Sequence, residues 1–514
     1  MAWRTAMNLS PCSIPKSNHV PGKHINSKKR QPKRAKYRVR IRMYRQGLGD
    51  CILLTFPKNR GGYCHMLIDC GVVLGTVDPK VVMTAVAKDI LAETKKKLDV
   101  LVITHEHWDH LSGFDENQAR AIFRQIKIGA LWLAWTEDET DDLARSLREE
   151  REQRKLAAKA AKEEAKKRGL KRQAQRLTEL LGFFGAKAAG DLSAEEEDAG
   201  GTAGAFVFLK KKCRPTIVET GTITEVPGVD NVRVYILGPP KDADAMRKTS
   251  PFKGEGYGLG ESPIGLADAF LAAFDPNGER AQPFAVAVRR SLADLKKKGA
   301  FPETMLEPGI SGYYHPKFSW RNIDDSWLAT GERLALQLDS ATNNTSLVLA
   351  IELEDKDVLL FVGDAQAGNW RSWESCKWDV KDGAEEKRHV TADELLKRTI
   401  FYKVGHHGSH NATLREKGLE LMKSDRLAAF IPVDTKVAHD VKGWEHMPLP
   451  AICERLKEKC AVVFQSDTKT LTDRGDADVR WKDSSKKFPV RMKDKKTKKT
   501  RTVRTQPLYT DYFV

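Results

Sequence analysis

The chain of 514 residues lacks several features that would place it in a familiar class. No stretch approaches the roughly 18 consecutive apolar residues of a membrane-spanning helix, so none is expected. The N-terminal segment contains no apolar core of a secretory signal. None of the eight cysteines forms a Cys-x-x-Cys pair, and several lie in apolar, strand-like runs such as the one at Cys51. We therefore expect a cytoplasmic protein with reduced thiols and no membrane partner.

Acidic residues are absent from one end of the chain and scarce at the other. Residues 1–42 contain twelve Lys or Arg and no Asp or Glu, and residues 486–514 contain ten Lys or Arg against two Asp. Of the net charge of +17, these ends carry +12 and +8, which leaves −3 for residues 43–485. Basic ends favour polyanions such as nucleic acid, or they only solubilise the chain. Residues 1–36 are polar and contain prolines, which predicts a disordered basic tail.

The rest of the chain has the pattern of an α/β domain, which we assign to residues 37–136 and 205–480. Residues 98–104 form a run that is apolar apart from Asp99 and the final threonine, as is typical of a strand covered on both faces. Residues 481–514 form a separate basic segment that ends in a possible strand. Further strands are predicted at 37–44, 51–56, 66–69, 217–240, 347–353, 358–362, 399–404, 427–433 and 461–464, and helices at 79–97 and 448–459.

An insertion of different composition interrupts this domain at residues 137–204. Up to Leu181 it is rich in Ala, Leu, Glu, Lys, Arg and Gln, which are strong helix formers. From Leu170 to Leu181, apolar residues follow a heptad spacing. We predict a charged helical arm, either one long helix or a hairpin broken near Gly169, followed by a linker. The arm is either a plain exposed helix or a site for dimerisation or a protein partner.

The strongest chemical signal is the string Thr-His-Glu-His-Trp-Asp-His at residues 104–110, directly after the buried strand. In an extended chain, residues two apart point the same way, so His105 and His107 can converge on one metal ion. Asp109 and His110 lie where the chain turns and can reach a second ion. Imidazole and carboxylate suit Zn²⁺ or Mn²⁺, and two adjacent ions can share a hydroxide and lower its pKa.

Two later strings place further ligand types at strand ends. Residues 359–364 run from an apolar strand into Asp364, whose carboxylate could bridge two ions. Residues 401–409 place His406 and His407 after another strand, and Gly408 permits close approach. Each string alone is compatible with an ordinary loop.

Together the three strings resemble the metallo-β-lactamase superfamily. The string Lys-Val-Gly-His-His-Gly-Ser at 403–409 resembles its ComEC-like branch, which is named for the hydrolase domain of bacterial DNA-uptake proteins. The resemblance covers about 40–135 and 205–470. It implies a four-layer αββα fold and a metal-dependent hydrolase. Its other supporting strings lie at 46–50, 67–71, 237–240 and 343–349.

The resemblance implies that His105 and His107 bind the first metal ion. Asp109, His110 and one of His406 and His407 would bind the second, and Asp364 would bridge. Of the histidine pair we favour His407 as the ligand and His406 as a contact to a substrate phosphate. Asp109 would also position the attacking hydroxide or accept its proton.

Three further residues are expected near the site. Asp69 would orient a metal ligand. Many superfamily members have a histidine where this chain has Asn343-Asn344, whereas the ComEC-like branch shares the asparagine. The first metal site would therefore be more open or would bind its ion more weakly. Asn344 is expected to lie beside this first site. His446 either lines the pocket or is a histidine of a surface loop.

These expectations favour a phosphodiesterase or nuclease that uses two divalent metal ions and contacts nucleic acid through its basic ends. A second hypothesis keeps the site but changes the substrate to a small ester, a lactone or a cyclic phosphodiester, because one fold hosts many reactions. A third is an interaction subunit of a bacterial complex with a conditional active site.

Overall fold

The computed structural model describes most of the chain from Tyr37 to Val514. The predicted disordered tail at 1–36 and most of the predicted linker lie outside the described residues. Within 37–514 the residues that are not described are 168, 185–199, 249–250, 253–254, 257–340, 382–386, 469–470, 476–479 and 494–499.

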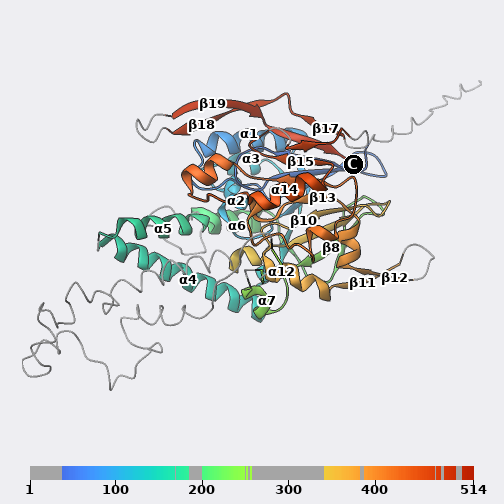
Figure 1. The fold of residues 1–514 in the computed structure, drawn as a ribbon, viewed down its shortest axis with the longest axis horizontal. Helices are drawn as coiled ribbons and strands as arrows, with labels where there is room; N and C mark the ends of the chain where they lie inside the picture. Colours follow the sequence, from blue (N-terminus) through green and yellow to red (C-terminus); the bar gives the residue numbers. More distant parts are fainter. Residues whose placement is uncertain are drawn as a thin grey trace, which may run out of the picture. The chain divides into compact units, whose positions relative to one another are not determined.

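One large sheet contains the N-terminal strands and both ends of the described chain (Figure 1). Alternate residues of β4 enter different apolar clusters, since Val100 and Val102 face the second sheet whereas Leu101 faces helices. This two-sided burial explains the apolar run that the sequence shows there. In spatial order the described strands are β17 (Arg480–Asp483), β20 (Tyr509–Phe513), β1 (Arg40–Tyr44), β2 (Ile52–Pro57), β3 (Tyr63–Ile68), β4 (Lys97–Val102), β5 (Lys127–Ala134) and β6 (Pro215–Val218).

The second large sheet is built from the later part of the chain. Its central strands β10, β13, β14 and β15 are parallel to one another, so their carboxyl ends share one edge. In spatial order the described strands are β16 (Thr472–Asp473), β15 (Val462–Gln465), β14 (Ala428–Ile431), β13 (Thr399–Lys403), β10 (Val358–Phe361), β9 (Val348–Glu352), β8 (Arg233–Gly238) and β7 (Ile223–Glu225).

The two sheets pack face to face, and helices cover their other faces. One apolar cluster joins both sheets, for example through Met43 and Phe361. A second covers the first sheet with α1 (Pro79–Glu93), α3 (Arg120–Phe123) and α6 (Gly201–Lys212). A third covers the second sheet with α12 (Ala367–Ser372), α13 (Ala392–Lys397) and α14 (Pro450–Lys459). The expected mixed α/β class is confirmed, and the described layers run helix, sheet, sheet, helix.

The insertion forms two helices that pack on each other, α4 (Asp142–Lys167) and α5 (Lys171–Leu181) (Figure 1). Gly169 adopts φ 72° at the turn between them, a conformation that glycine reaches without strain. Of the two predicted forms, the chain therefore adopts the hairpin. The predicted linker ends too late, because α6 begins at Gly201 and buries Thr202 and Ala205.

The predicted boundary near residue 480 is wrong, because the C-terminal segment is part of the domain. Strand β20 pairs with β1, with Tyr512 opposite Ile41, and Tyr512 is buried between the sheets. The guanidinium of Arg42 donates to both carboxylate oxygens of Asp511, at 2.8 and 3.0 Å. Strands β18 (Lys487–Lys493) and β19 (Thr500–Pro507) form a ribbon before β20. The high charge of this segment obscured the apolar residues that attach it to the core.

Two other features concern strands and membrane crossing. No strand was predicted at β5, or at the hairpin formed by β11 (Lys377–Lys381) and β12 (Lys387–Thr391). No helix in the described part of the chain is both long and apolar enough to cross a membrane.

Candidate metal centre

The string at 104–110 begins two residues after β4 and enters the short helix α2 (Trp108–Leu111). His107 is the extended residue before this helix, with φ −106° and ψ 154°. The backbone is thus extended at His107 and helical from Trp108. This change of direction turns Asp109 and His110 toward a second position, as the sequence predicts. All four potential ligands of the string are buried: His105, His107, Asp109 and His110.

His105 and His107 form the motif side of the centre. Nε2 of His105 lies 3.0 Å from Nδ1 of His107, and the ring centroids are 4.6 Å apart. The other ring nitrogen of His105 lies 3.1 Å from Oγ1 of Thr104 and 3.3 Å from Oγ of Ser346. These contacts direct Nε2 of His105 and Nδ1 of His107 toward the same point, as two ligands of one ion require.

Asp109, His110, Asp364 and His407 form the carboxylate side. Nε2 of His407 lies 2.9 Å from Oδ2 of Asp109 and 3.5 Å from Oδ2 of Asp364. Nε2 of His110 lies 3.3 Å from the same oxygen of Asp364 and 3.9 Å from Oδ2 of Asp109. Four donor atoms from three distant chain segments thus converge within 4 Å.

The outer ring nitrogens on this side have fixed partners. Nδ1 of His110 lies 2.8 Å from Oδ2 of Asp69, and Nδ1 of His407 lies 2.8 Å from the carbonyl oxygen of Pro432. Asp69 is itself held by the backbone N–H of Thr104 at 2.8 Å and the hydroxyl of Thr104 at 2.7 Å. Such contacts fix the orientation of an imidazole and direct its Nε2 toward a metal ion.

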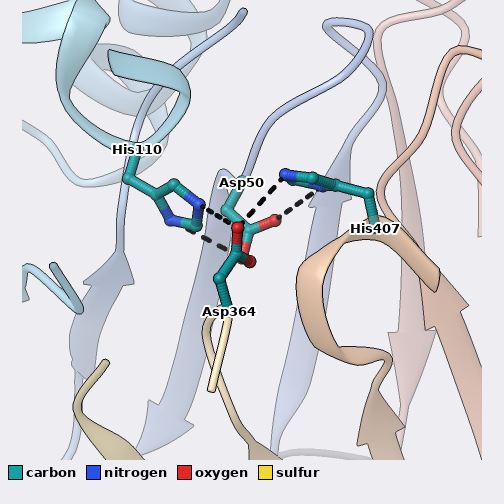
Figure 2. Close-up of side chains that lie close together, drawn as sticks. All are labelled: Asp50, His110, Asp364 and His407. Carbon is teal, nitrogen blue, oxygen red and sulfur yellow. Dashed lines mark ion pairs between the residues drawn. The ribbon is translucent and has the colours of Figure 1, made fainter. Parts of the chain in front are cut away.

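Asp50 and Lys403 also belong to the centre, and neither was predicted to be a site residue. Nζ of Lys403 lies 2.6 Å from Oδ2 of Asp50 and 3.3 Å from Oδ1 of Asp364, and it donates to the carbonyl of Gly363 at 2.7 Å. Figure 2 shows Asp50 beside Asp364, between the rings of His110 and His407. Both residues lie in strings quoted for the family resemblance, which is the signal that could have identified them.

Asp50 could join His110, Asp364 and His407 around one cation, since a ligand atom from each lies within 4.8 Å of the others. However, it approaches the outer nitrogens, at 3.9 Å from Nδ1 of His110 and 3.8 Å from Nδ1 of His407. Those nitrogens are already occupied, and Asp50 is paired with Lys403. We therefore assign the inward position to Asp109 and a supporting position to Asp50.

The loop that carries His406 and His407 is strained. Both histidines have positive φ, at 42° and 54°, and Gly408 follows at 85°. For a non-glycine residue this conformation costs energy and persists only where its surroundings enforce it. It directs His407 inward, whereas the side chain of His406 is 13% exposed, with its Nε2 3.9 Å from Oδ2 of Asp364.

Two expected neighbours of the site lie elsewhere. The amide nitrogen of Asn344 donates to the backbone carbonyl groups of Met246 and Lys248, and its oxygen accepts from backbone N–H groups at Gln366 and Asn369. Asn344 therefore braces the backbone, because a buried amide satisfies its polar atoms locally. Its neighbour Asn343 approaches the site, with Nδ2 3.5 Å from Nε2 of His406. His446 is exposed in the loop before α14, which fits the surface-loop alternative.

The histidines of the two sides have opposite pKa shifts. Burial lowers the pKa of His107 to about 3 and, together with the adjacent His110 and His107, lowers that of His105 well below its usual value. Burial would also lower the pKa of His110 and His407, but nearby carboxylates, led by Asp364, raise both. Asp364 itself has a pKa well below the ordinary range: burial opposes this, and His407 and His110 outweigh it.

The residues fit a divalent metal ion. Oδ1 of Asp109 and Nε2 of His110 are buried and make no hydrogen bond within the described part of the chain. A buried polar atom without a hydrogen bond needs another partner, which a metal ion bound between these two atoms would provide. Imidazole nitrogens and carboxylate oxygens are the donor set of zinc and manganese sites.

Glu106, which lies between His105 and His107 but is not a predicted ligand, contacts the helical insertion. Its carboxylate lies 3.0 Å from Nζ of Lys155 and 3.1 Å from Nη2 of Arg151, both on α4. It also accepts a hydrogen bond from the hydroxyl of Thr202 on α6, at 2.9 Å. Burial opposes ionisation, but Lys155 and Arg151 lower the pKa of Glu106 to about 2. The string at 104–110 therefore carries potential metal ligands and also attaches the insertion to the domain through Glu106.

Comparison with known families supports this geometry. The family model for the metallo-beta-lactamase superfamily matches residues 45–182, so this stretch carries a metallo-β-lactamase superfamily domain. The match contains Asp50, Asp69 and the string at 104–110, whereas Asp364 and His407 lie beyond it. A search of curated proteins gave no match. The superfamily domain and the buried group of aspartates and histidines together indicate a metal-dependent hydrolase.

Proposed function

We propose that this superfamily domain hydrolyses phosphodiester bonds of nucleic acid with two divalent metal ions, zinc or manganese. The observation that carries the proposal is the position of Asp364, whose charge acts on the pKa of His105 and His107 as well as on that of His110 and His407. Its Oδ2 lies within 3.5 Å of Nε2 of both His110 and His407. A carboxylate so placed suits the bridging role in a centre of two ions.

Bound divalent ions would supply an activated water and neutralise charge on the phosphoryl oxygens. Asp109 is suited to orient that water, because Oδ2 is engaged by His407 while Oδ1 has no hydrogen bond among the described residues. Burial opposes ionisation of Asp109, but His110 and His407 hold its pKa below the ordinary value. It is therefore a carboxylate at neutral pH and can accept a hydrogen bond or a proton from the water.

His406 is suited to contact the substrate. Its side chain is 13% exposed, whereas those of His110 and His407 are almost fully buried, and burial lowers the pKa of His406 to about 4. A neutral imidazole at neutral pH would donate an N–H hydrogen bond to a phosphoryl oxygen rather than provide a full positive charge.

The preference for a polyanion is supported by the basic ribbon β18–β19. Its residues Lys487, Arg491 and Arg501 are exposed. The ribbon also approaches the site. Nη2 of Arg504 lies 3.9 Å from Oδ2 of Asp434, and Asp434 follows two residues after Pro432, whose carbonyl oxygen contacts His407. A basic surface in a fixed position attracts phosphate backbones and speeds their association. The resemblance of residues 403–409 to the ComEC-like branch points to the same substrate class.

The test is cleavage of single-stranded DNA, double-stranded DNA and RNA by the full chain supplied with Mn²⁺ or Zn²⁺. The double variant Asp109→Ala, His110→Ala serves as control. We expect cleavage by the unaltered chain, and loss of cleavage and of bound metal in the variant. Equal cleavage by both proteins, or hydrolysis of only small esters, lactones or cyclic phosphodiesters, would contradict the proposal.

A further inference from the structure

The helical insertion reaches the metal centre through two phenylalanines at its end. Phe183 and Phe184 lie in the short helix η3 (Gly182–Phe184) that follows α5. Their ring centroids are 5.4 and 5.2 Å from that of His107. Both rings are largely buried, so they form a wall against the motif side. The insertion therefore borders the active site and does more than project from the domain.

A tryptophan from a distant segment completes this wall. The ring of Trp444 is parallel to that of Phe183, with an interplanar angle of 6° and a centroid distance of 5.6 Å. Trp444 is partly exposed, so it offers aromatic surface that Phe183 does not. Its loop continues to Leu449, whose N–H donates to the carbonyl of Gly408 at 2.8 Å. Trp444 thus belongs to a loop that is attached to the histidine loop. We call Phe183, Phe184 and Trp444 the aromatic wall.

Positive charge lies on the aromatic wall. Nζ of Lys442 is 5.8 Å from the ring centroid of Phe183 and 5.7 Å from that of Trp444. The loop at 72–78 connects the wall to the basic ribbon. At one end of this loop, Leu74 packs closely on Gly182, the residue before Phe183: a Cβ added to Gly182 would lie only 2.9 Å from a methyl group of Leu74. At the other end of the loop, Asp78 pairs with Arg491 of the ribbon at 2.8 Å. A basic surface and the aromatic wall therefore border the same loop.

Contacts to Glu106 hold the part of the wall that the insertion provides. Lys155, which pairs with the buried Glu106, also lies over the ring of Phe184 at 4.5 Å. The same carboxylate binds Arg151 on α4 and Thr202 on α6, so elements on both sides of η3 are attached to the motif. A preorganised aromatic surface binds a ligand without an entropic cost of ordering it.

We propose that the aromatic wall is a base-stacking subsite for single-stranded nucleic acid. An unpaired base next to the scissile phosphodiester stacks on the exposed surface of Trp444, and Lys442 lies near the adjoining phosphate. Aromatic side chains stack on any base, whereas the bases of a duplex are already stacked on one another. This inference rests on the proposed phosphodiester hydrolysis and defines its substrate as unpaired strands.

The experiment measures binding rather than turnover, so it does not depend on catalysis. The full chain is titrated into a fluorescein-labelled, cleavage-resistant phosphorothioate oligothymidylate, and anisotropy gives Kd. A second probe has the same backbone with abasic residues in place of the nucleosides. The variants are Trp444→Leu and the conservative Trp444→Phe. Tyr63→Leu is the control. Tyr63 is an aromatic residue that is 48% exposed, and it lies at the start of β3, whereas Asp69 follows the other end of that strand.

We expect Trp444→Leu to raise Kd for the oligothymidylate by about 5- to 100-fold, the range for one stacked base. Trp444→Phe should restore most of the affinity, and Tyr63→Leu should change nothing. The abasic probe should bind the unaltered chain and Trp444→Leu equally. Thermal melting checks that each variant folds. Because Trp444 is partly exposed, its replacement is expected to leave the fold intact.

Three results would overturn the subsite: unchanged affinity of Trp444→Leu, an equal loss with the abasic probe, or an equal loss with a duplex of the same length. These results are separate from the fate of the proposed hydrolysis. A base-dependent loss of binding supports the subsite even if no metal ion restores cleavage. Cleavage that is insensitive to Trp444 rejects the subsite and leaves the hydrolase intact.

Discussion

The two sides of the metal centre are built from similar ligands, yet they differ in chain origin and in charge. The motif side takes His105 and His107 from one short extended stretch and surrounds them with other rings, including Phe183 and Phe184. The carboxylate side adds Asp364 and His407 from strands far along the chain to the helix residues Asp109 and His110.

This difference sets the protonation of each side before any metal ion binds. On the motif side, burial lowers the pKa of His105 and His107 by more than the nearby carboxylates raise it. Both imidazoles are therefore neutral at neutral pH, and their nitrogens can bind a cation. On the carboxylate side, Lys403 lies against the buried carboxylates, and these carboxylates raise the pKa of His110 and of His407. Similar ligands therefore behave as neutral donors in one place and as members of an ion-pair network in the other.

The largest effect is expected from Asp364→Asn, which removes a charge that acts on the histidines of both sides. We expect both metal ions to be lost and hydrolysis to fall by about 100- to 1000-fold, because a preorganised charge at the reacting centre is removed. His105→Ala should release the ion of the motif side alone. Metal-to-protein ratios after dialysis distinguish the variants, and retention of two ions by Asp364→Asn would show that the carboxylate does not join the sides.

Lys403→Met tests whether the carboxylate side depends on a buried cation. Removing Lys403 takes away the ion-pair partner of the buried Asp50 and one of the cationic neighbours of Asp364, which should cost about 3–5 kcal/mol of unfolding free energy in the metal-free protein. The loss should shrink when Mn²⁺ or Zn²⁺ is present, since a bound ion replaces part of the charge.

Urea unfolding with and without metal measures this loss. Lys97→Met is the matched control, because Lys97 also pairs with a carboxylate, Asp99 at 3.0 Å, but is 57% exposed. Its removal should cost less than about 1 kcal/mol. An equal loss of unfolding free energy in Lys403→Met and Lys97→Met would contradict the predicted difference between a buried and an exposed ion pair.

Glu106→Gln tests how firmly the motif side holds the insertion. The pKa of Glu106 is about 2 in the folded protein and about 4.3 in an unfolded chain, a difference equivalent to about 3 kcal/mol. Because the folded pKa is depressed, this stabilisation is fully present above pH 4.3 or so and is lost as the pH falls toward 2. The difference in unfolding free energy between the unaltered chain and the variant should therefore disappear over that window.

Denaturant unfolding at neutral and acid pH measures this difference. Glu152→Gln is the control, since Glu152 pairs with the same Lys155 at 2.8 Å but is 47% exposed. A difference for Glu106→Gln that does not change with pH would mean that the carboxylate acts through packing rather than charge.

The parts of the fold that were predicted correctly are those with strong local patterns. The apolar run at β4 and the strand-end positions of Asp364 and His407 follow from short apolar runs and from the glycines that come after two of them. Strand β5 gave no such signal, because Lys127 and Gly129 interrupt the apolar residues in the first half of its run. The contact between the aromatic wall and His107 had no signal either, because it joins residues that are far apart in the sequence.

The sequence by itself determined the motif side and the chemistry of the ligands. Their spacing and the direction of an extended chain place His105 and His107 together without help from distant residues. The tertiary structure alone decided the carboxylate side, the supporting pair Asp50–Lys403, the attachment of β20 to β1 and the position of the insertion against the site. The physical reason is that these contacts depend on how two sheets and their helices pack, which no local pattern of residues specifies.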